Sequence, residues 1–491
     1  MRIRVGGKYQ HLVSSAGCAC CAPELGAITH AMNKRESGLS RREALAGIAA
    51  AAASLGLPAS AQTAAPGVSQ QARGVLFEDV RIFDGSGSLT PPSSVFVLGD
   101  KIRGISRGPT AAPADVALTR INGGGRTLMP GLIDAHVHVM FEALPQVAIL
   151  TGDISYITVA ALRTANDMLM RGYTSVRDLG GPVLGVKRGI DQGLAPGPRI
   201  WPSGAFISQT GGHGDFRLPN DMPAAPGSFT FSERVGAAAI ADSPDLVRQR
   251  AREQLALGAS QLKLMAGGGV SSHYDPLDVT QYTVPELRAA VEAAENWGTY
   301  VTVHAYTPRA VRQSIEAGVR CIDHGQLLDE ATVVLMNEKG VWWSLQPFTE
   351  DGPSAFAEGS PNRLKQIEMN RGAETAYALA KKFGMRIAWG TDILFDPKAA
   401  ARRPRDLMKM TRWYTPVEIL RMATTDNAAL LALSGPRNPY PGKVGVVEQD
   451  ALADLLLVDG DPIRDIDLLG RPESSLKVIM KGGAIVKNTL A

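Results

Sequence analysis

The chain has few cysteines, no long hydrophobic run in its main part and almost no net charge. Only four of its 491 residues are cysteine, and three of these, Cys18, Cys20 and Cys21, lie near the N-terminus. After residue 61 only Cys321 remains, so no intramolecular disulfide can form in that part of the chain. A hydrophobic core or a bound metal ion must therefore stabilise the fold.

Basic residues are not in excess once the N-terminal segment is set apart. The formal net charge is +3, and residues 1–61 contribute seven Lys or Arg and three Glu, which is +4. The remaining 430 residues therefore carry about −1. A near-neutral body has no basic face for a phosphate backbone, which argues against a nucleic-acid partner and favours a small one.

Residues 1–61 are predicted to be an export signal. Arg41 and Arg42 precede the apolar, Ala-rich run 46–57, and Ala59-Ser60-Ala61 has the small-x-small pattern of a cleavage site. The arginine pair resembles a twin-arginine signal, which predicts a periplasmic or secreted protein. The alternative is a cytoplasmic protein with an amphipathic N-terminal helix, in which Met32 is a second candidate start. No later segment reaches the 18 apolar residues of a membrane span, so no stable membrane anchor is expected.

The two ends of the remaining chain have the same β-rich texture. Residues 62–130 and 434–491 contain short β-branched runs between Gly, Pro and Asp turns, among them 75–83, 95–98, 454–458 and 477–480. We expect these two ends to join in one small β-sandwich domain.

Residues 131–433 alternate short β-branched runs with helical stretches, which is typical of an α/β fold with a parallel sheet. The eight predicted strands lie near 132–139, 174–177, 199–206, 261–265, 300–304, 320–323, 341–345 and 386–389. The predicted helices include 244–257, 284–297, 308–317 and 363–382.

Eight such units of strand and helix predict a (β/α)₈ TIM-like barrel, whose chemistry lies at the carboxyl ends of the strands. An open doubly wound sheet is the alternative, although no Gly-x-Gly-x-x-Gly supports it. The long loops 207–243 and 267–283 are expected to serve binding.

Histidines gather at the predicted strand ends. His136 and His138 are two residues apart on a strand, so both imidazoles project to the same side. His304 and His324 end the fifth and sixth strands, and Asp392 follows the eighth. Imidazoles and a carboxylate that converge at one barrel mouth suit zinc or a similar divalent ion with an open position for water. A single histidine would more often be structural, but the whole set predicts a metal site.

Lys263 interrupts an apolar strand, where a buried ammonium ion is costly and desolvation favours the free amine. A neutral lysine amine can take up carbon dioxide, and the two carbamate oxygens can bridge two metal ions. The alternative is a lysine that reaches solvent or pairs with an acid.

The sequence resembles the metal-dependent amidohydrolase superfamily over residues 74–491. The resemblance is carried by Pro130–His138, Lys263, His304, Asp323-His324-Gly325, Gly390-Thr391-Asp392 and Ala453-Asp454-Leu455. Within it, the loops 210–215 and 267–272 resemble the imidazolonepropionase-related branch, which contains Xaa-Pro dipeptidases and ochratoxin-hydrolysing amidases.

The resemblance implies two divalent ions, expected to be zinc. It places His136, His138 and Asp392 on one ion, His304 and His324 on the other, and carboxylated Lys263 between them. It also implies a homo-oligomer. Asp323 stands where the branch commonly has Glu, and at this position behind the ligands we expect only a tuning effect.

Two such metal ions can activate a water molecule, which predicts a hydrolytic reaction. Asp392 is the candidate general base during the attack of water and then the candidate general acid that protonates the leaving amine. For substrate binding we single out three residues, His213, Tyr306 and, more weakly, Arg309; packing roles are the alternative for the first two. Aromatic residues near the seventh strand suggest an apolar wall, namely Trp342, Trp343, Phe348 and Phe356. For the two tryptophans a place in the core is the simpler interpretation, because adjacent residues of a strand face opposite sides.

The sequence therefore predicts an amidohydrolase that releases a C-terminal amino acid from a dipeptide or an N-acyl amino acid, ochratoxin A included. One alternative is a cyclic amidase, lactonase or deaminase on the same metal site, because substrate choice lies in the loops. The other alternative is a non-catalytic binding protein that has lost its metals, against which the complete ligand set argues.

Overall fold

The computed structural model describes residues 4–5, 8–9, 72–85, 87–108, 116–225, 227–349 and 354–490. The chain divides into two units, Met1–Gln70 and Gln71–Ala491. In the first unit the described residues are two short antiparallel strands, β1 (Arg4–Val5) and β2 (Lys8–Tyr9). The predicted arginine pair, apolar run and cleavage site of the export signal lie outside the described residues. Within the described ranges, no helix combines the length and the apolar character needed to cross a membrane.

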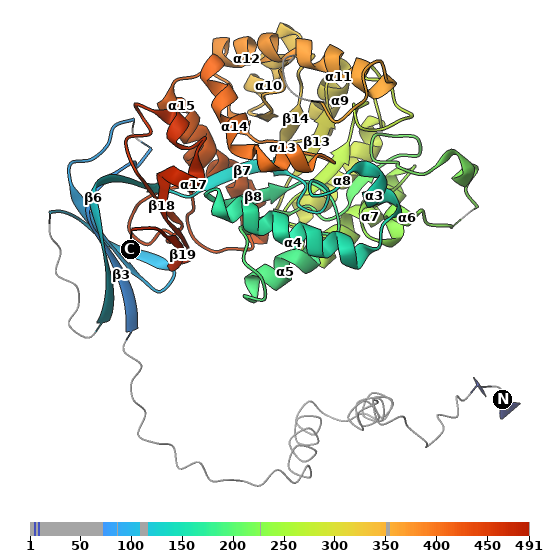
Figure 1. Ribbon diagram of the computed structural model, residues 1–491. Helices are drawn as coiled ribbons and strands as arrows, with labels where there is room; N and C mark the ends of the chain where they lie inside the picture. The colour runs from blue at the N-terminus through green and yellow to red at the C-terminus, as the bar shows by residue number, and fades with distance from the viewer. Residues whose placement is uncertain are drawn as a thin grey trace. The chain divides into compact units, whose positions relative to one another are not determined.

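Strands from both ends of the second unit form one seven-stranded sheet (Figure 1). Its order is β19-β18-β17-β6-β3-β4-β5. The N-terminal strands are β3 (Ala72–Ile82), β4 (Ser93–Leu98), β5 (Lys101–Arg107) and β6 (Val116–Pro130). The C-terminal strands are β17 (Leu455–Val458), β18 (Leu476–Lys481) and β19 (Ala484–Asn488). The two ends meet where β6 pairs antiparallel with β17, over a buried cluster that contains Phe77, Val95 and Leu457.

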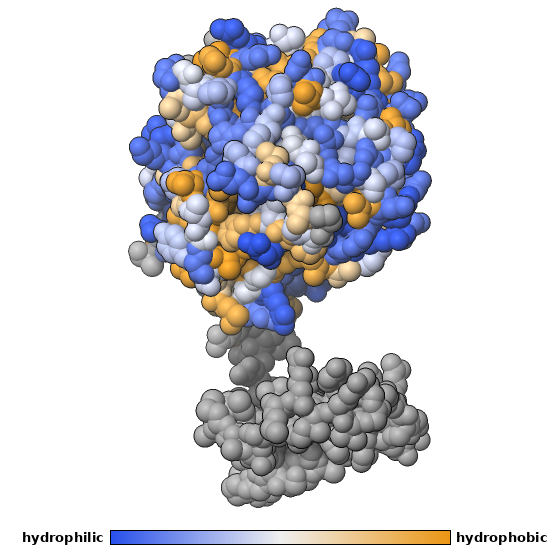
Figure 2. Space-filling view, turned by 90° about the vertical axis from the view of Figure 1, so that its right-hand side faces the viewer, coloured by the Kyte–Doolittle hydropathy of each residue, from blue (hydrophilic) through white to orange (hydrophobic). Residues whose placement is uncertain are grey.

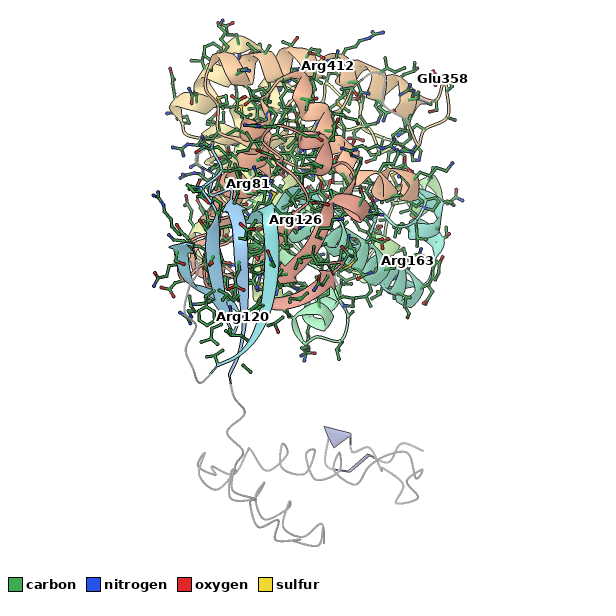
Figure 3. The ribbon with its side chains drawn as sticks, turned by 60° about the vertical axis from the view of Figure 1, so that its left-hand side comes forward. Arg81, Arg120, Arg126, Arg163, Glu358 and Arg412 are labelled. Atoms are coloured by element: carbon green, nitrogen blue, oxygen red, sulfur yellow. The ribbon has the colours of Figure 1, made fainter. Side chains whose placement is uncertain are left out.

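Ion pairs cross this sheet and its neighbouring loops. Figure 3 shows Arg81, Arg120 and Arg126 along strands β3 and β6. Arg120 pairs with Glu78 at 2.7 Å, and Arg126 pairs with Asp459 at 2.8 Å. Because these side chains are partly exposed, each pair contributes about 1 kcal/mol at most. The buried apolar cluster, and not these charges, stabilises the sheet.

The barrel strands are all parallel to their neighbours. The first three are β7 (Leu132–Val137), β8 (Tyr173–Asp178) and β9 (Arg199–Pro202). The next are β10 (Phe206–Ser208), β12 (Leu262–Met265), β13 (Val301–Ala305), β14 (Cys321–His324), β15 (Trp342–Leu345) and β16 (Ile387–Trp389), with β11 (Ala238–Ile240) outside β10. The α/β fold with a TIM-like barrel and a β domain is therefore as predicted.

The predicted third strand, 199–206, is broken into two pieces. Its first piece, β9, pairs with β8, and its second piece, β10, pairs with β12. Gly204 lies between them with a φ of 72°, a conformation that glycine adopts without strain. The chain therefore shifts at Gly204 from one half of the barrel wall to the other.

Helices follow the strands and surround them (Figure 1). Their bounds are α3 (Gln146–Thr151), α4 (Ile154–Met170), α5 (Leu184–Asp191), α6 (Phe231–Arg234), α7 (Pro244–Leu257), α8 (Val284–Asn296), α9 (Pro308–Ala317), α10 (Glu330–Glu338), α11 (Pro361–Arg371), α12 (Ala373–Lys382), α13 (Pro397–Ala401), α14 (Arg403–Met408), α15 (Pro416–Arg421), α16 (Asn427–Leu431) and α17 (Pro472–Ser475). The predicted helix 363–382 is two helices, α11 and α12, which meet at Gly372. A Cβ atom there would lie 2.1 Å from the Gln326 carbonyl oxygen, so the close packing of the helix junction requires glycine.

Strands β7 and β16 close the barrel through polar contacts. The Asp392 N–H donates to the His136 carbonyl at 2.8 Å. The buried Asn427 side chain donates to the carbonyls of Ile133 and Trp389, at 2.7 and 2.8 Å, and accepts from the Trp389 N–H at 3.0 Å. A single side chain thus joins the first and last strands of the barrel.

Replacement of Asn427 by Ala is expected to lower the free energy of unfolding by about 3 kcal/mol. The reason is that three buried backbone groups lose their hydrogen-bond partner. Urea denaturation followed by circular dichroism measures the change. The matched control is Asn296→Ala, at an exposed position at the end of α8, which is expected to change stability by less than about 0.5 kcal/mol. Equal stability of the two variants would contradict the joining role of Asn427.

The surface carries apolar side chains as well as charges. On the face drawn in Figure 2, hydrophobic residues gather in the lower half among hydrophilic ones. Helices α3 and α4 expose three large apolar residues, Val147 at 68%, Tyr156 at 58% and Val159 at 65%.

Candidate metal centre and active-site cavity

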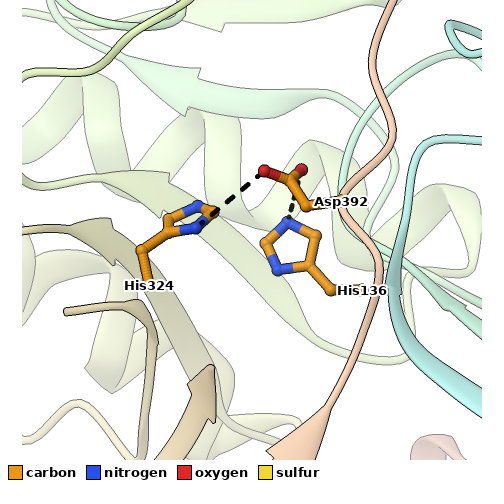
Figure 4. A group of neighbouring side chains, drawn as sticks. All are labelled: His136, His324 and Asp392. Carbon is orange, nitrogen blue, oxygen red and sulfur yellow. Dashed lines mark ion pairs between the residues drawn. The ribbon is translucent and has the colours of Figure 1, made fainter. Parts of the chain in front are cut away.

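The carboxyl ends of strands β7, β14 and β16 bring three candidate metal ligands together. Nitrogen and oxygen atoms of His136, His324 and Asp392 lie within 4.8 Å of one another (Figure 4). His324 and Asp392 have positive φ values of 77° and 48°, so the backbone turns at each of them as the strand ends. Strained backbone of this kind persists where the surrounding structure fixes it, and it clusters at functional sites.

The Asp392 carboxylate lies between the imidazoles. Its Oδ1 atom is 3.2 Å from Nε2 of His136 and 3.2 Å from Nε2 of His138, and its Oδ2 atom is 3.9 Å from Nδ1 of His324. Two buried atoms of this group, His136 Nε2 and Asp392 Oδ1, have no hydrogen-bond partner. Buried polar atoms are otherwise satisfied in folded proteins. A nitrogen and a carboxylate oxygen that face each other at 3.2 Å without a hydrogen bond therefore fit a divalent metal ion.

Burial favours the neutral form of three of the four imidazoles, whereas Asp392 and Asp323 raise the pKa of His136 against the effect of its burial. Burial lowers the pKa of His138, and it lowers the pKa values of His304 and His324 well below their usual range. These imidazoles are therefore neutral near pH 7 and keep a lone pair for a metal. Burial alone would raise the pKa of Asp392, but the neighbouring His136 and His138 hold it well below its usual range, so it is a carboxylate.

His304 lies beside this group without being part of it. Its ring centroid is 4.5 Å from that of His324, and its Nε2 atom is 3.0 Å from the Gly268 carbonyl oxygen. The structure thus brings His304 to the same place, as the strand positions predict, with one ring nitrogen engaged by the backbone.

Lys263 is buried on β12 and pairs with an acid. Its Nζ atom donates to Oδ2 of Asp323 at 2.5 Å. Burial lowers the pKa of Lys263 against the opposing effect of Asp323. This is the acid-paired arrangement that the sequence left open, and the lysine still faces the cavity that holds the histidines.

Asp323 is more central than the sequence suggested. It is fully buried, and besides Lys263 it accepts hydrogen bonds from Arg177 at 2.8 Å and from the Thr302 hydroxyl at 2.7 Å. Its Oδ1 atom is also 3.5 Å from Nδ1 of His136. Burial would raise its pKa, but Lys263 and Arg177 hold it well below its usual range. The available signal was Arg177, a basic residue inside a predicted barrel strand, as Lys263 is.

A second network of buried ion pairs and hydrogen bonds was not predicted from the sequence. Arg403 pairs with Asp134 and Glu142, and it donates to the Thr391 hydroxyl at 2.7 Å. Asp134 in turn accepts from the Thr391 N–H at 3.0 Å. Because Thr391 directly precedes Asp392, this network holds the turn that presents the Asp392 carboxylate. Buried carboxylates far apart in sequence give no local pattern that identifies their partner.

One cavity of about 480 Å³ contains the candidate ligands. All six predicted ligands line it, and so do His213 and Tyr306. Its apolar wall includes four phenylalanines whose neighbouring ring centroids lie 6.1–6.3 Å apart, namely Phe141, Phe206, Phe216 and Phe395. Phe348 and Phe356 also line the cavity, as predicted.

The two tryptophans are not part of this wall. Trp343 is completely buried and donates its indole N–H to the His324 carbonyl at 2.6 Å. Trp342 packs on the other face of β15 with Tyr300 and Cys321. The two tryptophans are therefore core residues, which is the simpler of the two interpretations of their sequence, because adjacent strand residues face opposite sides and here both sides are core.

A hydrogen-bonded loop holds His213 against the site. Its ring stacks on that of His304 at a centroid distance of 4.0 Å, and its Nδ1 atom is 2.7 Å from the Ser272 hydroxyl and 3.3 Å from the Asp275 carboxylate. Nε2 therefore remains for a ligand in the cavity. The Lys365 ammonium fixes the loop by donating to carbonyls of Gly269, Ser272 and Asp275 at 2.6–3.2 Å.

Tyr306 and Arg309 have different surroundings. The Tyr306 ring lies 4.9 Å from that of His304 and 5.3 Å from that of His324. Burial raises the pKa of Tyr306 well above its usual range, so the hydroxyl remains a donor. Arg309 does not reach the cavity, because it is exposed at the start of α9 and lines a separate surface hollow with Asp278 and Glu316. Arg309 lies two residues after Thr307, the N-cap of α9, and at this position its side chain points away from the barrel mouth.

A parallel barrel with buried imidazoles and a carboxylate at the carboxyl ends of its strands has the architecture of a hydrolytic barrel enzyme. The model of the Amidohydrolase family matches residues 127–485, and the chain belongs to this family. The family is generally metal-dependent, and the chain is a hydrolase that acts on amide or peptide bonds.

The relatives include an ochratoxinase, a prolidase and a Xaa-Pro dipeptidase. An ochratoxinase from Aspergillus niger is 30% identical over 377 residues, which is 73% of this chain and 75% of that protein. A prolidase crystallised with N-methylphosphonate-L-proline has a TM-score of 0.77 at 33% identity, covering 85% of this chain and all of the other. A Xaa-Pro dipeptidase with bound methionine has a TM-score of 0.72 at 26% identity, covering 84% of this chain and all of the other.

Proposed function

We propose that this protein is a binuclear metal-dependent amidohydrolase that releases a C-terminal amino acid from dipeptides or N-acyl amino acids. Ochratoxin A, cleaved to ochratoxin α and phenylalanine, is a candidate substrate. The observation that carries the proposal is that the buried atoms His136 Nε2 and Asp392 Oδ1 have no hydrogen-bond partner, in a cavity with an aromatic wall. The ochratoxinase and prolidase relatives support it.

The proposed ligands divide into two groups around one bridge. His136, His138 and Asp392 hold one ion, and His304 and His324 hold the other. Lys263, as its carbamate, lies between them, which requires that its amine leave Asp323. When bound, such ions, proposed to be zinc, supply a water nucleophile at neutral pH and polarise the scissile carbonyl.

Asp392 is the proposed proton carrier. Its carboxylate is ionised and its Oδ1 atom has no hydrogen-bond partner, so it can accept the proton of the attacking water. The protonated carboxyl then donates to the amide nitrogen as the C–N bond breaks, because an unprotonated amine anion is a poor leaving group. The products are an acid and a free amino acid.

His213 and Tyr306 are proposed to hold the substrate α-carboxylate. Both line the cavity, and both offer a polar atom that no described protein group occupies, His213 Nε2 and the Tyr306 hydroxyl. His213 stacks on His304 and Tyr306 meets the same ring edge to face, which places both at one side of the metal ligands. Arg309 is left out of this role because it lies outside the cavity.

Tyr306→Phe is expected to raise KM about tenfold for N-acyl amino acids with a free α-carboxylate, because a charge-assisted hydrogen bond is lost. The KM for the matching C-terminal amides is expected to stay within twofold. Steady-state kinetics on N-acetyl-phenylalanine and its amide measure both. Tyr274→Phe is the control, since that hydroxyl donates to the Arg217 carbonyl at 2.9 Å, in the loops beyond the metal ligands. Equal KM changes for acid and amide would contradict a carboxylate role.

Identification of the products tests the proposed function. The protein from residue 62 onward, prepared with zinc and bicarbonate, is offered Xaa-Pro dipeptides, N-acyl aromatic amino acids, ochratoxin A and lactones, and both products are followed by chromatography. Release of a free α-amino acid supports the proposal. Lactone opening or ammonia release alone would assign a cyclic amidase, lactonase or deaminase, and a protein that takes up no metal would be a binding protein.

Export and self-association complete the proposal. The arginine pair and cleavage pattern support a periplasmic or secreted protein, and subcellular fractionation with N-terminal sequencing tests it. The exposed apolar side chains of α3 and α4 support a homo-oligomer, which light scattering on the purified protein tests.

A further inference from the structure

Two arginines line the active-site cavity without a partner. Arg402 lies at the junction of α13 and α14, and Arg405 lies on α14. Within the part of the chain that the structure describes, neither guanidinium has a hydrogen bond or an ion pair. Arg402 is half-buried and Arg405 is exposed, so both can meet a ligand that enters the cavity.

The backbone that presents Arg402 is anchored from inside. The next residue, Arg403, is buried between Asp134 and Glu142. On the other side, Asp396 caps α13 by accepting from the N–H groups of Lys398 and Ala399 at 2.9 Å. The contacts of Arg403 and the helix cap at Asp396 therefore fix the backbone on both sides of Arg402.

The neighbouring charges leave this wall with one positive charge in excess. The other charged residues of this segment that line the cavity are Asp396, Asp406 and Lys409, so three cationic side chains face two carboxylates. Lys409 pairs with Asp406 at 2.7 Å, and Asp396 caps its helix. Among the described residues, no ion pair joins either carboxylate to Arg402 or Arg405.

The arginines and the proposed α-carboxylate site come from different walls. Tyr306 follows β13, whereas Arg402 follows β16, which adjoins β7 at the closure of the barrel. Phenylalanines of the β7 and β16 loops, Phe141 and Phe395, lie on the Arg402 side with centroids 6.1 Å apart. A substrate whose α-carboxylate contacts Tyr306 thus directs its acyl group along apolar rings toward the arginines.

We propose that Arg402 and Arg405 form a subsite for a second carboxylate, carried at the far end of the acyl group. The preferred substrates are then N-acyl amino acids with an apolar or aromatic acyl chain that ends in a carboxylate. This inference rests on the proposed amide hydrolysis. Planar guanidinium groups suit a carboxylate because they donate two parallel hydrogen bonds.

Paired substrates of graded length test the subsite. N-glutaryl-, N-suberoyl- and N-dodecanedioyl-L-phenylalanine are each compared with the neutral acyl compound of equal length. We expect kcat/KM to favour the dicarboxylate about tenfold at one chain length or more, and added salt to reduce the preference. Arg402→Gln with Arg405→Gln is expected to remove the preference and leave the neutral substrates within twofold. Arg464→Gln, at a side chain that is 88% exposed in another loop, is the matched control.

Each outcome decides the inference. Equal rates for dicarboxylate and neutral substrates at every length, or a preference that survives the double substitution, would overturn it and leave the proposed hydrolysis intact. If none of the compounds is hydrolysed, the proposed activity on N-acyl amino acids fails, and calorimetry with the same compounds decides the subsite. A tighter Kd for the dicarboxylate that the double variant loses would then support it, and equal Kd values would overturn it.

Discussion

Asp392→Asn is expected to lower kcat by about 10²–10⁴-fold and to leave KM within about threefold. The amide of asparagine has nearly the shape of the carboxylate but can neither accept the proton of water nor return it to the leaving amine. The interactions lost are those of the transition state, so turnover falls without a matching loss of substrate binding. Steady-state kinetics on the best amide substrate measure both constants.

Metal content must be measured beside the kinetics, because Asp392 is also a proposed ligand. Atomic emission on the dialysed protein separates a loss of proton transfer from a loss of metal. Asp396→Asn is the matched control, since this carboxylate lines the same cavity but serves as a helix cap. Near wild-type turnover of a fully metallated Asp392→Asn protein would reject the role of Asp392 in catalysis.

Lys263→Ala is expected to reduce bound metal by at least one ion per chain and to lower kcat/KM on the order of 10³-fold or more. The carbamate that bridges the two ions in the proposed site cannot form on alanine. The fold is expected to persist, because Asp323 keeps its hydrogen bonds from Arg177 and Thr302. Metal analysis after preparation with zinc and bicarbonate, together with circular dichroism, measures both expectations.

Lys365→Ala is the control for removal of a lysine near the cavity. That ammonium binds backbone carbonyls of the loop 267–283, which holds His213, so its loss is expected to raise KM but to leave the metal in place. If Lys263→Ala keeps two ions and wild-type activity, Lys263 is only the ion-pair partner of Asp323, as in the structure.

The sequence by itself determined the barrel and the set of candidate ligands. Strand and helix periodicity is local, so the helices 244–257 and 308–317 agree with α7 and α9 to the residue. The spacing of His136 and His138 and the strand-end positions of His304 and His324 follow from the same periodicity. Because parallel strands of a barrel end at one mouth, the sequence also predicts that these residues meet there.

Only the tertiary structure decided which buried charges meet and which side chains face the cavity. Asp323 meets Arg177 and Lys263, and Arg403 meets Asp134, across sequence separations of 60 to 269 residues. No local pattern encodes such pairs, because burial makes each charge require a partner but does not say which one. For the same reason, the sequence alone did not decide whether the tryptophans of β15 and the exposed Arg309 line the cavity. Whether a side chain lines the cavity depends on what the rest of the chain packs against it.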